Sequence, residues 1–201
     1  MTDFLPKDYS APEVQSNCMT LEEGVNSFRI LSPAIVGYEW WVEQGAEGRR
    51  PVRVRTFEEI PDEVREATDS RQRAKHFWAF TVYNYKTQTI QILALKQQTV
   101  MRAIEAFVKN PKWGNPQNYD LIIEKVRTGS RDFDVEYNVI PEPPTKLDEG
   151  IVELAKSVPV RLEALYSGED PFAEPVEAEA HAPRQSNHRE RTAYRRTRSY
   201  S

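Results

Sequence analysis

Aromatic and cationic side chains gather in residues 75–86, which read KHFWAFTVYNYK. Lysine stands at both ends of this stretch, and the rings between the two lysines belong to His76, Phe77, Trp78, Phe80, Tyr83 and Tyr85. A flat ring stacks on an unpaired nucleobase, while a nearby cation pairs with phosphate. Stacking contributes roughly 1–3 kcal/mol per base and tolerates any base. The stretch therefore predicts a surface that binds single-stranded nucleic acid.

Alternation along a strand divides these rings between two faces, because successive side chains point to opposite sides. The inner face is expected to hold Trp78, Phe80 and Val82. The outer face is expected to offer Phe77, Tyr83 and Tyr85 as a stacking platform. Trp40 and Trp41 are adjacent in the sequence, so one of them is also expected to face outward.

Candidate phosphate-binding cations concentrate in the long charged segment 45–75. Alternation in PVRVR places Arg53 and Arg55 on one face of this segment. The full set of expected cations is Arg49, Arg50, Arg53, Arg55, Arg71, Arg73, Lys75, Lys86, Arg127 and Arg131. Acidic residues between 58 and 69 could neutralise part of this charge, and solvated surface is the alternative use of such arginines.

Motifs of catalysis are missing from the sequence. It contains no GxxxxGK[ST], HExxH, GxSxG or paired-cysteine pattern, so we expect no enzyme activity. The acidic pair at 58–59 fits solvated surface better than a nuclease metal site. A single cysteine, Cys18, excludes an internal disulfide and a cysteine-rich zinc site, and no metal or cofactor is expected.

Composition divides the 201 residues into a globular region and two polar ends. Residues 1–20 are expected to form an irregular N-terminal segment. Residues 167–201 are expected to form a disordered tail that is first acidic and then Arg-rich. The net charge of -4 does not by itself indicate a nucleic-acid binder. The local concentration of positive charge on the surface therefore matters more than the total charge. The chain has no secretory signal and no apolar run of about 20 residues, so a cytoplasmic protein without membrane contact is expected.

The globular region, 21–145, is expected to be mainly β. Strands are predicted at 25–32, 35–43, 77–85, 89–95, 119–127 and 133–140. The first two are expected to form one long strand bent at Gly37, followed by a long loop with a short helix near Pro61. An amphipathic helix is predicted at 99–110, with Thr99 as its N-cap and with Val100, Met101, Ile104, Phe107 and Val108 on one face.

This order of elements is that of an OB-fold, a five-stranded barrel with a helix between strands 3 and 4. A further C-terminal helical segment is expected at 146–166, interrupted at Pro159. The loop between strands 1 and 2 and the loop between strands 4 and 5 are those that OB-folds use on ligands. They carry most of the arginines named above.

The chain also resembles the single-stranded-DNA-binding proteins of tailed bacteriophages and prophages. The resemblance runs over about residues 20–145, through GVNSFRILSPAIVGYEWW, KHFWAFTVYNYKTQTIQIL, WGNPQNYDLIIEKVRTG and DVEYNVIP. It implies an OB-fold protein that coats transient single strands during phage DNA replication, recombination and repair, without sequence preference or catalysis. The implied location is the cytoplasm of an infected bacterial host.

Two features depart from this group of proteins. Some members hold a structural zinc through Cys and His, which a chain with one cysteine cannot do. Members commonly end in an acidic tail that recruits replication or recombination partners. Here the residues that resemble its docking tip, Asp170, Pro171 and Phe172, lie inside the chain. Two alternatives stay open, an OB-fold protein-protein interaction module and a strand-annealing recombination protein, and self-association is not excluded.

Overall fold

The computed structural model describes residues 16–45, 48–69, 72–131 and 134–173. The strands are β1 (Cys18–Met19), β2 (Gly24–Ile30), β3 (Ile35–Glu43), β4 (Arg49–Val54), β5 (Lys75–Asn84), β6 (Thr89–Leu95), β7 (Asp120–Arg127) and β8 (Val135–Pro141). The helices are α1 (Asp62–Arg65), α2 (Gln98–Lys109), the 3-10 turn η2 (Pro116–Asn118), α3 (Glu149–Ser157) and α4 (Ala164–Ser167). The expected mainly β class is confirmed.

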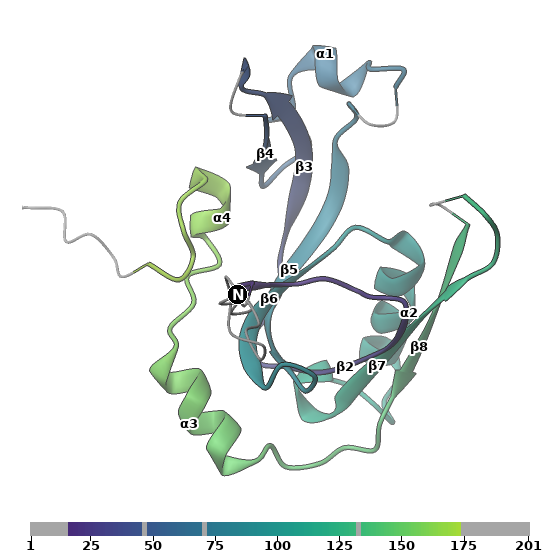
Figure 1. Ribbon diagram of the computed structural model, residues 1–201, viewed down its shortest axis with the longest axis vertical. Coiled ribbons are helices and arrows are strands. Elements are labelled where there is room, and N and C mark those ends of the chain that lie inside the picture. The colour runs from purple at the N-terminus through teal and green to yellow at the C-terminus, as the bar shows by residue number, and fades with distance from the viewer. Residues whose placement is uncertain (1–15, 46–47, 70–71, 132–133, 174–201) are drawn as a thin grey trace, which may run out of the picture.

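All eight strands belong to one mixed sheet. Its main order is β1-β6-β5-β2-β7-β8, and β3 pairs with both β4 and β5. Every pair is antiparallel except β1 with β6. In Figure 1 the sheet curls around α2, and an arm made of β3, β4, α1 and the beginning of β5 extends from it. The helices α3 and α4 follow the outside of the sheet, with α4 beside β4.

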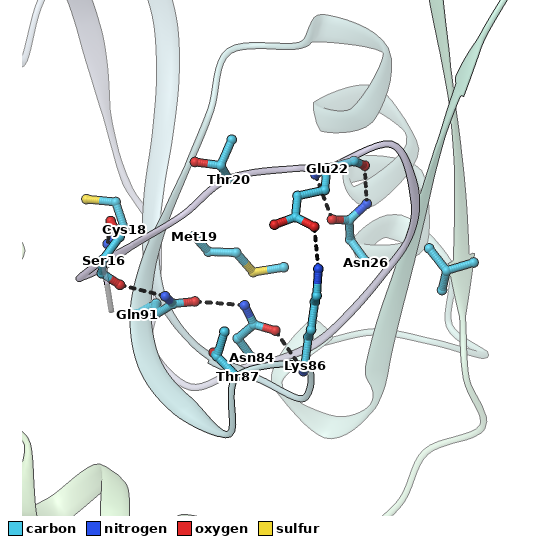
Figure 2. Close-up of a pocket in the computed structure, with 11 residues that line it drawn as sticks. Ser16, Cys18, Met19, Thr20, Glu22, Asn26, Asn84, Lys86, Thr87 and Gln91 are labelled. Atoms are coloured by element: carbon cyan, nitrogen blue, oxygen red, sulfur yellow. Dashed lines mark hydrogen bonds and ion pairs between the residues drawn. The ribbon is translucent and has the colours of Figure 1, made fainter. Parts of the chain in front are cut away.

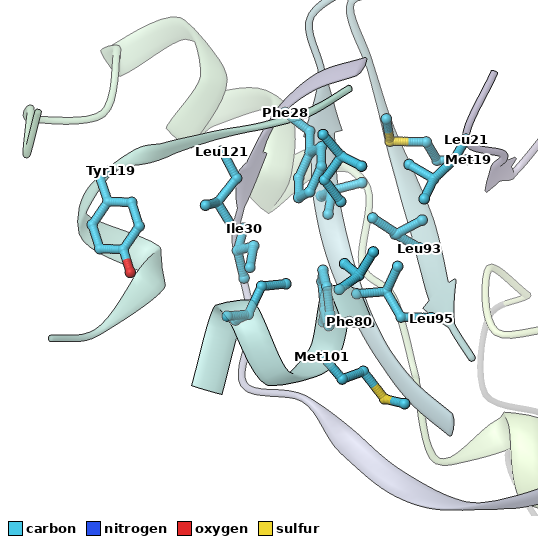
Figure 3. Close-up of a cluster of buried hydrophobic side chains, with 14 residues drawn as sticks. Met19, Leu21, Phe28, Ile30, Phe80, Leu93, Leu95, Met101, Tyr119 and Leu121 are labelled. Atoms are coloured by element: carbon cyan, nitrogen blue, oxygen red, sulfur yellow. The ribbon is translucent and has the colours of Figure 1, made fainter. Parts of the chain in front are cut away.

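The main core lies inside the curl, between the sheet and α2 (Figure 3). Phe80 and Val82 point into it from β5, which confirms two of the three expected inner residues. The third, Trp78, is only half-buried and packs at the margin of this core. The helix α2 contributes Val100, Met101 and Ile104, as its amphipathic pattern predicts. Val108, expected on the same face, is instead 48% exposed.

A second, smaller core forms on the outer face of β5 and β6. Phe77, Ala79 and Ile92 are buried there beneath residues 160–172. The covering side chains are Val160, Leu162, Leu165, Tyr166 and Phe172. The expectation that Phe77 is an exposed stacking ring is therefore wrong, because the C-terminal segment covers the face on which alternation places it.

The first two strands are separate elements, not one strand bent at Gly37. The chain leaves β2 after Ile30, and Pro33, which lacks a backbone donor, lies in the short connection to β3. β3 then runs through Gly37 without interruption. The expected long loop also contains a strand, β4, which pairs with β3 and leaves only the part around α1 irregular.

Gly37 is required by a close approach and not by a bend. A Cβ atom at this position would lie 2.2 Å from the backbone oxygen of Val54 in β4. We expect Gly37→Ala to lower the free energy of unfolding by about 1–3 kcal/mol, because the arm strands must move apart to make room. Val36→Ala, at an exposed neighbour, is expected to change it by no more than about 0.5 kcal/mol. Chemical denaturation measures both, and equal values would contradict the clash.

Helix ends agree in part with the sequence patterns. α2 ends before Pro111 as expected, but its N-cap is Gln97 and not Thr99. The expected C-terminal helical segment is present as α3 and α4, on either side of Pro159. Residues 167–173, expected in the tail, are ordered against the sheet, whereas 1–15 and 174–201 lie outside the described residues. Among the residues that the structure describes, no helix has the length and apolar character that crossing a membrane requires.

Candidate nucleic-acid interface

A groove runs between the base of the arm and α2. It consists of two adjoining cavities of about 390 and 360 Å³, which share His76 and Gln98 in their walls. We call it the arm groove. Its lining residues are Arg73, Ala74, Lys75, His76, Trp78, Lys96, Gln98, Met101, Arg102 and Glu105. Most of these side chains lie on β5 or α2, whereas Arg73 and Ala74 directly precede β5 and Lys96 directly follows β6.

Two rings line the middle of the arm groove. His76 and Trp78 occupy alternate positions of β5 and therefore point to the same face. The indole N–H of Trp78 donates a hydrogen bond to Nε2 of His76 over 3.2 Å, which links the two rings. Tyr38 supports the imidazole from β3, with ring centroids 5.3 Å apart. The half-buried indole of Trp78 thus has a fixed orientation suited to stacking.

Four cationic side chains line the same groove: Arg73, Lys75, Lys96 and Arg102. Lys75 and Arg102 are exposed and form no ion pair with another residue of the described ranges. The acid of the lining, Glu105, is paired with Lys109 over 2.5 Å, and this contact lowers the pKa of the Glu105 carboxyl. The groove therefore carries an excess of positive charge.

Lys96 and Arg53 share a buried carboxylate. The side chain of Glu39 is only 1% exposed and lies 2.8 Å from Arg53 and 2.5 Å from Lys96. The Arg53 guanidinium also lies over the ring of Phe77, and Lys96 lies 5.9 Å from the Trp41 ring. Arg53, expected to contact phosphate, is thus largely buried and neutralised within the arm.

Most other predicted cations are also paired with acids. Arg55 contacts Glu163 over 2.5 Å and lies over the ring of Tyr166, both from the C-terminal segment. The remaining pairs are Arg49 with Glu43, Lys86 with Glu22, Arg127 with Glu23 and Arg131 with Asp134. The acids in these five pairs lie outside the segment 58–69. Arg50 is exposed at the free end of the arm, and Arg71 lies outside the described residues.

The predicted rings do not form one platform. Trp40 is 5% exposed, whereas Trp41 is 46% exposed, so Trp41 is the outward-facing member of the pair. Tyr83 and Tyr85 are half-buried and pack edge to face, 5.1 Å between centroids. Since Tyr85 follows Phe77 by eight positions, it lies about 26 Å further along the chain. The tyrosines and the arm are therefore separate regions.

Tyr85 belongs to a polar network around Arg29. Its hydroxyl donates to Oδ1 of Asp120 over 2.9 Å, and the same oxygen accepts Nη1 of Arg29 over 2.8 Å. The Arg29 side chain is 2% exposed and also donates to the backbone oxygens of Gln117 and Thr145. The network fastens the loop after β8 to β2 and β7, a structural role that the sequence patterns did not indicate.

Burial, followed by the hydrogen bond to Asp120 and that carboxylate's negative charge, raises the pKa of Tyr85 to about 12. The protonated phenol therefore stabilises the fold fully below its ordinary pKa of 10.0, and this contribution is lost as the pH rises to about 12. We expect the difference between ultraviolet titrations of the protein and of Tyr85→Phe to have its midpoint near 12. A midpoint near 10 would show that the phenol is neither buried nor held by Asp120 in this way.

Another cavity, of about 240 Å³, lies between residues 16–26 and the β5–β6 hairpin (Figure 2). Its buried amides are paired with one another and with the backbone: Asn84 donates to Gln91, and Gln91 donates to the Ser16 carbonyl. Asn26 holds the turn at Glu22 through hydrogen bonds in both directions. These contacts fasten the N-terminal segment to the sheet, so the cavity is structural.

The predicted partner-docking residues lie against the sheet. Phe172 packs on the second core beside Phe77, and its backbone N–H is capped by the Asp170 carboxylate over 2.9 Å. The backbone oxygen of Pro171 accepts a hydrogen bond from the Arg161 N–H. The Phe172 ring is therefore already engaged within the chain.

In the described part of the chain, histidine, cysteine, aspartate and glutamate form no group of three or more suited to a metal ion. Of the sequence-predicted site residues, the arm groove brings together Arg73 and Lys75. It adds His76, Trp78, Lys96 and Arg102, which were not among the predicted binding residues. Comparisons with known proteins give no match to a family model, a curated protein or a solved structure.

Proposed function

We propose that the protein binds single-stranded DNA without sequence preference and without catalysis, and that the strand lies in the arm groove. The observation that carries this proposal is the composition of the groove. The two linked rings are flanked by four cations, of which Lys96 is paired with the buried Glu39, and the acid of the lining, Glu105, is already paired with Lys109. Rings accept any base and cations accept the phosphates, which is the combination that sequence-independent binders use. Coating of transient strands during replication, recombination and repair is the role that fits such binding.

The strand connections support an OB-fold origin. Pairs β2–β5, β5–β6, β2–β7 and β7–β8, with α2 between β6 and β7, follow the order expected of that barrel. The pair that would close it, β6 with β8, is not among the described pairs, and β1 lies beside β6 instead. The proposed fold is therefore an OB-fold variant with an added arm and a C-terminal cover.

Titration of the protein with an oligothymidine tests the proposal. Binding is expected to quench tryptophan fluorescence, because Trp78 and Trp41 lie in or beside the groove. The logarithm of the association constant should fall linearly with the logarithm of salt concentration, by about 0.7 per phosphate contact. An oligocytidine of equal length should bind similarly. If the oligothymidine neither binds nor quenches tryptophan fluorescence at low salt, the proposal is contradicted.

A protein-interaction module is the second candidate. Its support is the pair of exposed rings on the arm, Trp41 and Phe57, which are 46% and 50% exposed. The neutralisation of Arg49, Arg53 and Arg55 by acids also favours a protein partner over a polyanion at the arm itself. Lack of oligonucleotide binding, together with loss of a co-purifying partner in Trp41→Ala, would favour this candidate. Strand annealing stays a prediction, tested by timing duplex formation from complementary strands.

A further inference from the structure

A further cavity, of about 370 Å³, adjoins the arm groove at Trp78, which lines both. We call it the end pocket. It lies between the β2–β3 connection, the last turn of α2 and η2, and its apolar walls include Pro33, Ala34, Ile104 and Val108. Its volume falls in the usual range of small-ligand sites. The shared indole makes it continuous with the proposed strand path.

The end pocket and the arm groove differ in charge. None of the residues that line the end pocket is charged, whereas the arm groove carries Arg73, Lys75, Lys96 and Arg102. Phosphate is therefore favoured in the groove and excluded from the pocket. An uncharged flat ring has the opposite preference, because it gains from leaving water and from contact with the Trp78 indole.

The exposed side chain of Val108 indicates that the end pocket binds a ligand. The residue lies on the apolar face of α2 with Val100 and Ile104, which are buried, yet 48% of it remains exposed. Together with the half-buried indole of Trp78, it leaves an apolar wall open to solvent. Concave apolar surface of this kind, with few polar groups, is typical of ligand sites.

One polar group at the pocket is available for hydrogen bonding. Asn115 and Gln117 bond to each other, since the Gln117 backbone N–H donates to Asn115 Oδ1 over 3.0 Å and Asn115 Nδ2 donates to Gln117 Oε1 over 3.2 Å. This arrangement orients the Gln117 amide. Its nitrogen donates to no other residue in the described ranges. A carbonyl oxygen on the edge of a base is a suitable acceptor.

We infer that the end pocket takes one unstacked nucleobase from a strand whose phosphates follow the arm groove. The base stacks on the Trp78 indole, contacts Val108 and Pro33, and accepts a hydrogen bond from Gln117. This inference rests on the proposed function and adds to it a defined base site on the α2 side, away from the face that residues 160–172 cover. An apolar side chain of a protein partner is the competing occupant.

Two matched pairs of variants test the base site, with the shortest oligothymidine that binds at full affinity as the probe. Val108→Asp places a carboxylate in the pocket, and Ala106→Asp adds the same charge at an exposed position of α2 outside it. Ala34→Leu fills the pocket without charge, and Ala106→Leu is its control. We expect each pocket variant to bind about 5- to 150-fold more weakly than its control.

Abasic substitution along the same oligothymidine gives an independent readout. One position is expected to cost a similar 5- to 150-fold in the unaltered protein and to lose this effect in Ala34→Leu. Pocket variants that bind like their controls, with an unchanged abasic profile, would overturn the base site while leaving binding in the groove intact. If Val108→Asp unfolds, the comparison of Ala34→Leu with Ala106→Leu tests the base site. Failure of the unaltered protein to bind oligothymidine would overturn the proposed function itself.

Discussion

Replacing Arg29 by alanine is expected to lower the free energy of unfolding by about 3–5 kcal/mol. The guanidinium is 2% exposed, pairs with Asp120 over 2.8 Å and donates to two backbone oxygens. Its removal leaves the Asp120 carboxylate without its cation, with the Tyr85 hydroxyl still donating to it, and takes a donor from the carbonyls of Gln117 and Thr145. Because the last of these lies after β8, the loop that leads to α3 is expected to loosen as well.

Chemical denaturation of Arg29→Ala beside Arg49→Ala measures this effect. Arg49 is also paired, over 2.8 Å with Glu43, but both side chains are more than half exposed. Its loss is expected to cost no more than about 1 kcal/mol, since water replaces an exposed pair at little cost. If the two variants lose equal stability, the Arg29 network does not hold the C-terminal part of the fold.

Removing two groove cations together, Lys75→Ala with Arg102→Ala, is expected to weaken oligothymidine binding about 25-fold at 0.1 M salt. Each phosphate contact contributes about 0.7 to the salt dependence, so the slope should decrease in magnitude by about 1.4. Neither residue forms an ion pair with another described residue, and the nearby Glu105 keeps its pair with Lys109, so their loss leaves no acid unpaired.

Lys146→Ala with Lys156→Ala is the matched control. Both lysines are exposed and precede the C-terminal cover, outside the lining of the arm groove, and Lys146 has only a fully solvated pair with Glu149, in which both side chains are 85% exposed. The control removes the same net charge, so it separates local contact from the general field of the protein. An equal loss of affinity and slope in both double variants would show that the groove is not the phosphate path.

Local patterns in the sequence predicted the elements whose neighbours are close in the chain. The β5–β6 hairpin follows from β-branched and aromatic residues around a polar turn, and α2 follows from its apolar spacing and Pro111. β4 was missed because its arginines and Pro51 resemble a charged loop. Its strand geometry depends on pairing with β3, which composition does not reveal.

The position of the C-terminal segment could not be predicted, since it depends on packing between residues far apart in the chain. Alternation placed Phe77 on the outer face of β5 correctly, but the cover of Leu162, Leu165 and Tyr166 buries it. For the same reason, Glu163 could not be recognised as the partner of Arg55. Surface charge and exposed rings inferred from sequence are sensitive to such long-range contacts.

The candidate site was predicted in part. Lys75 and Arg73 were expected to bind phosphate, and the structure places both in the arm groove. Trp78 was assigned to the core because alternation puts it on the face of Phe80 and Val82. β5 extends past the main core at this end, so the same face becomes half-exposed from Trp78 to His76. The sequence does not show how far β5 extends beyond the core, and this length decides whether Trp78 is buried.

Photo-crosslinking of bound oligothymidine, with the attachment site mapped by mass spectrometry, tests the central claim most directly. If the strand lies in the arm groove, crosslinks are expected at His76 or Trp78, and they should decline in the Lys75→Ala and Arg102→Ala double variant. Crosslinks confined to Tyr83, Tyr85 or Phe57, with none at His76 or Trp78, would contradict binding in this groove.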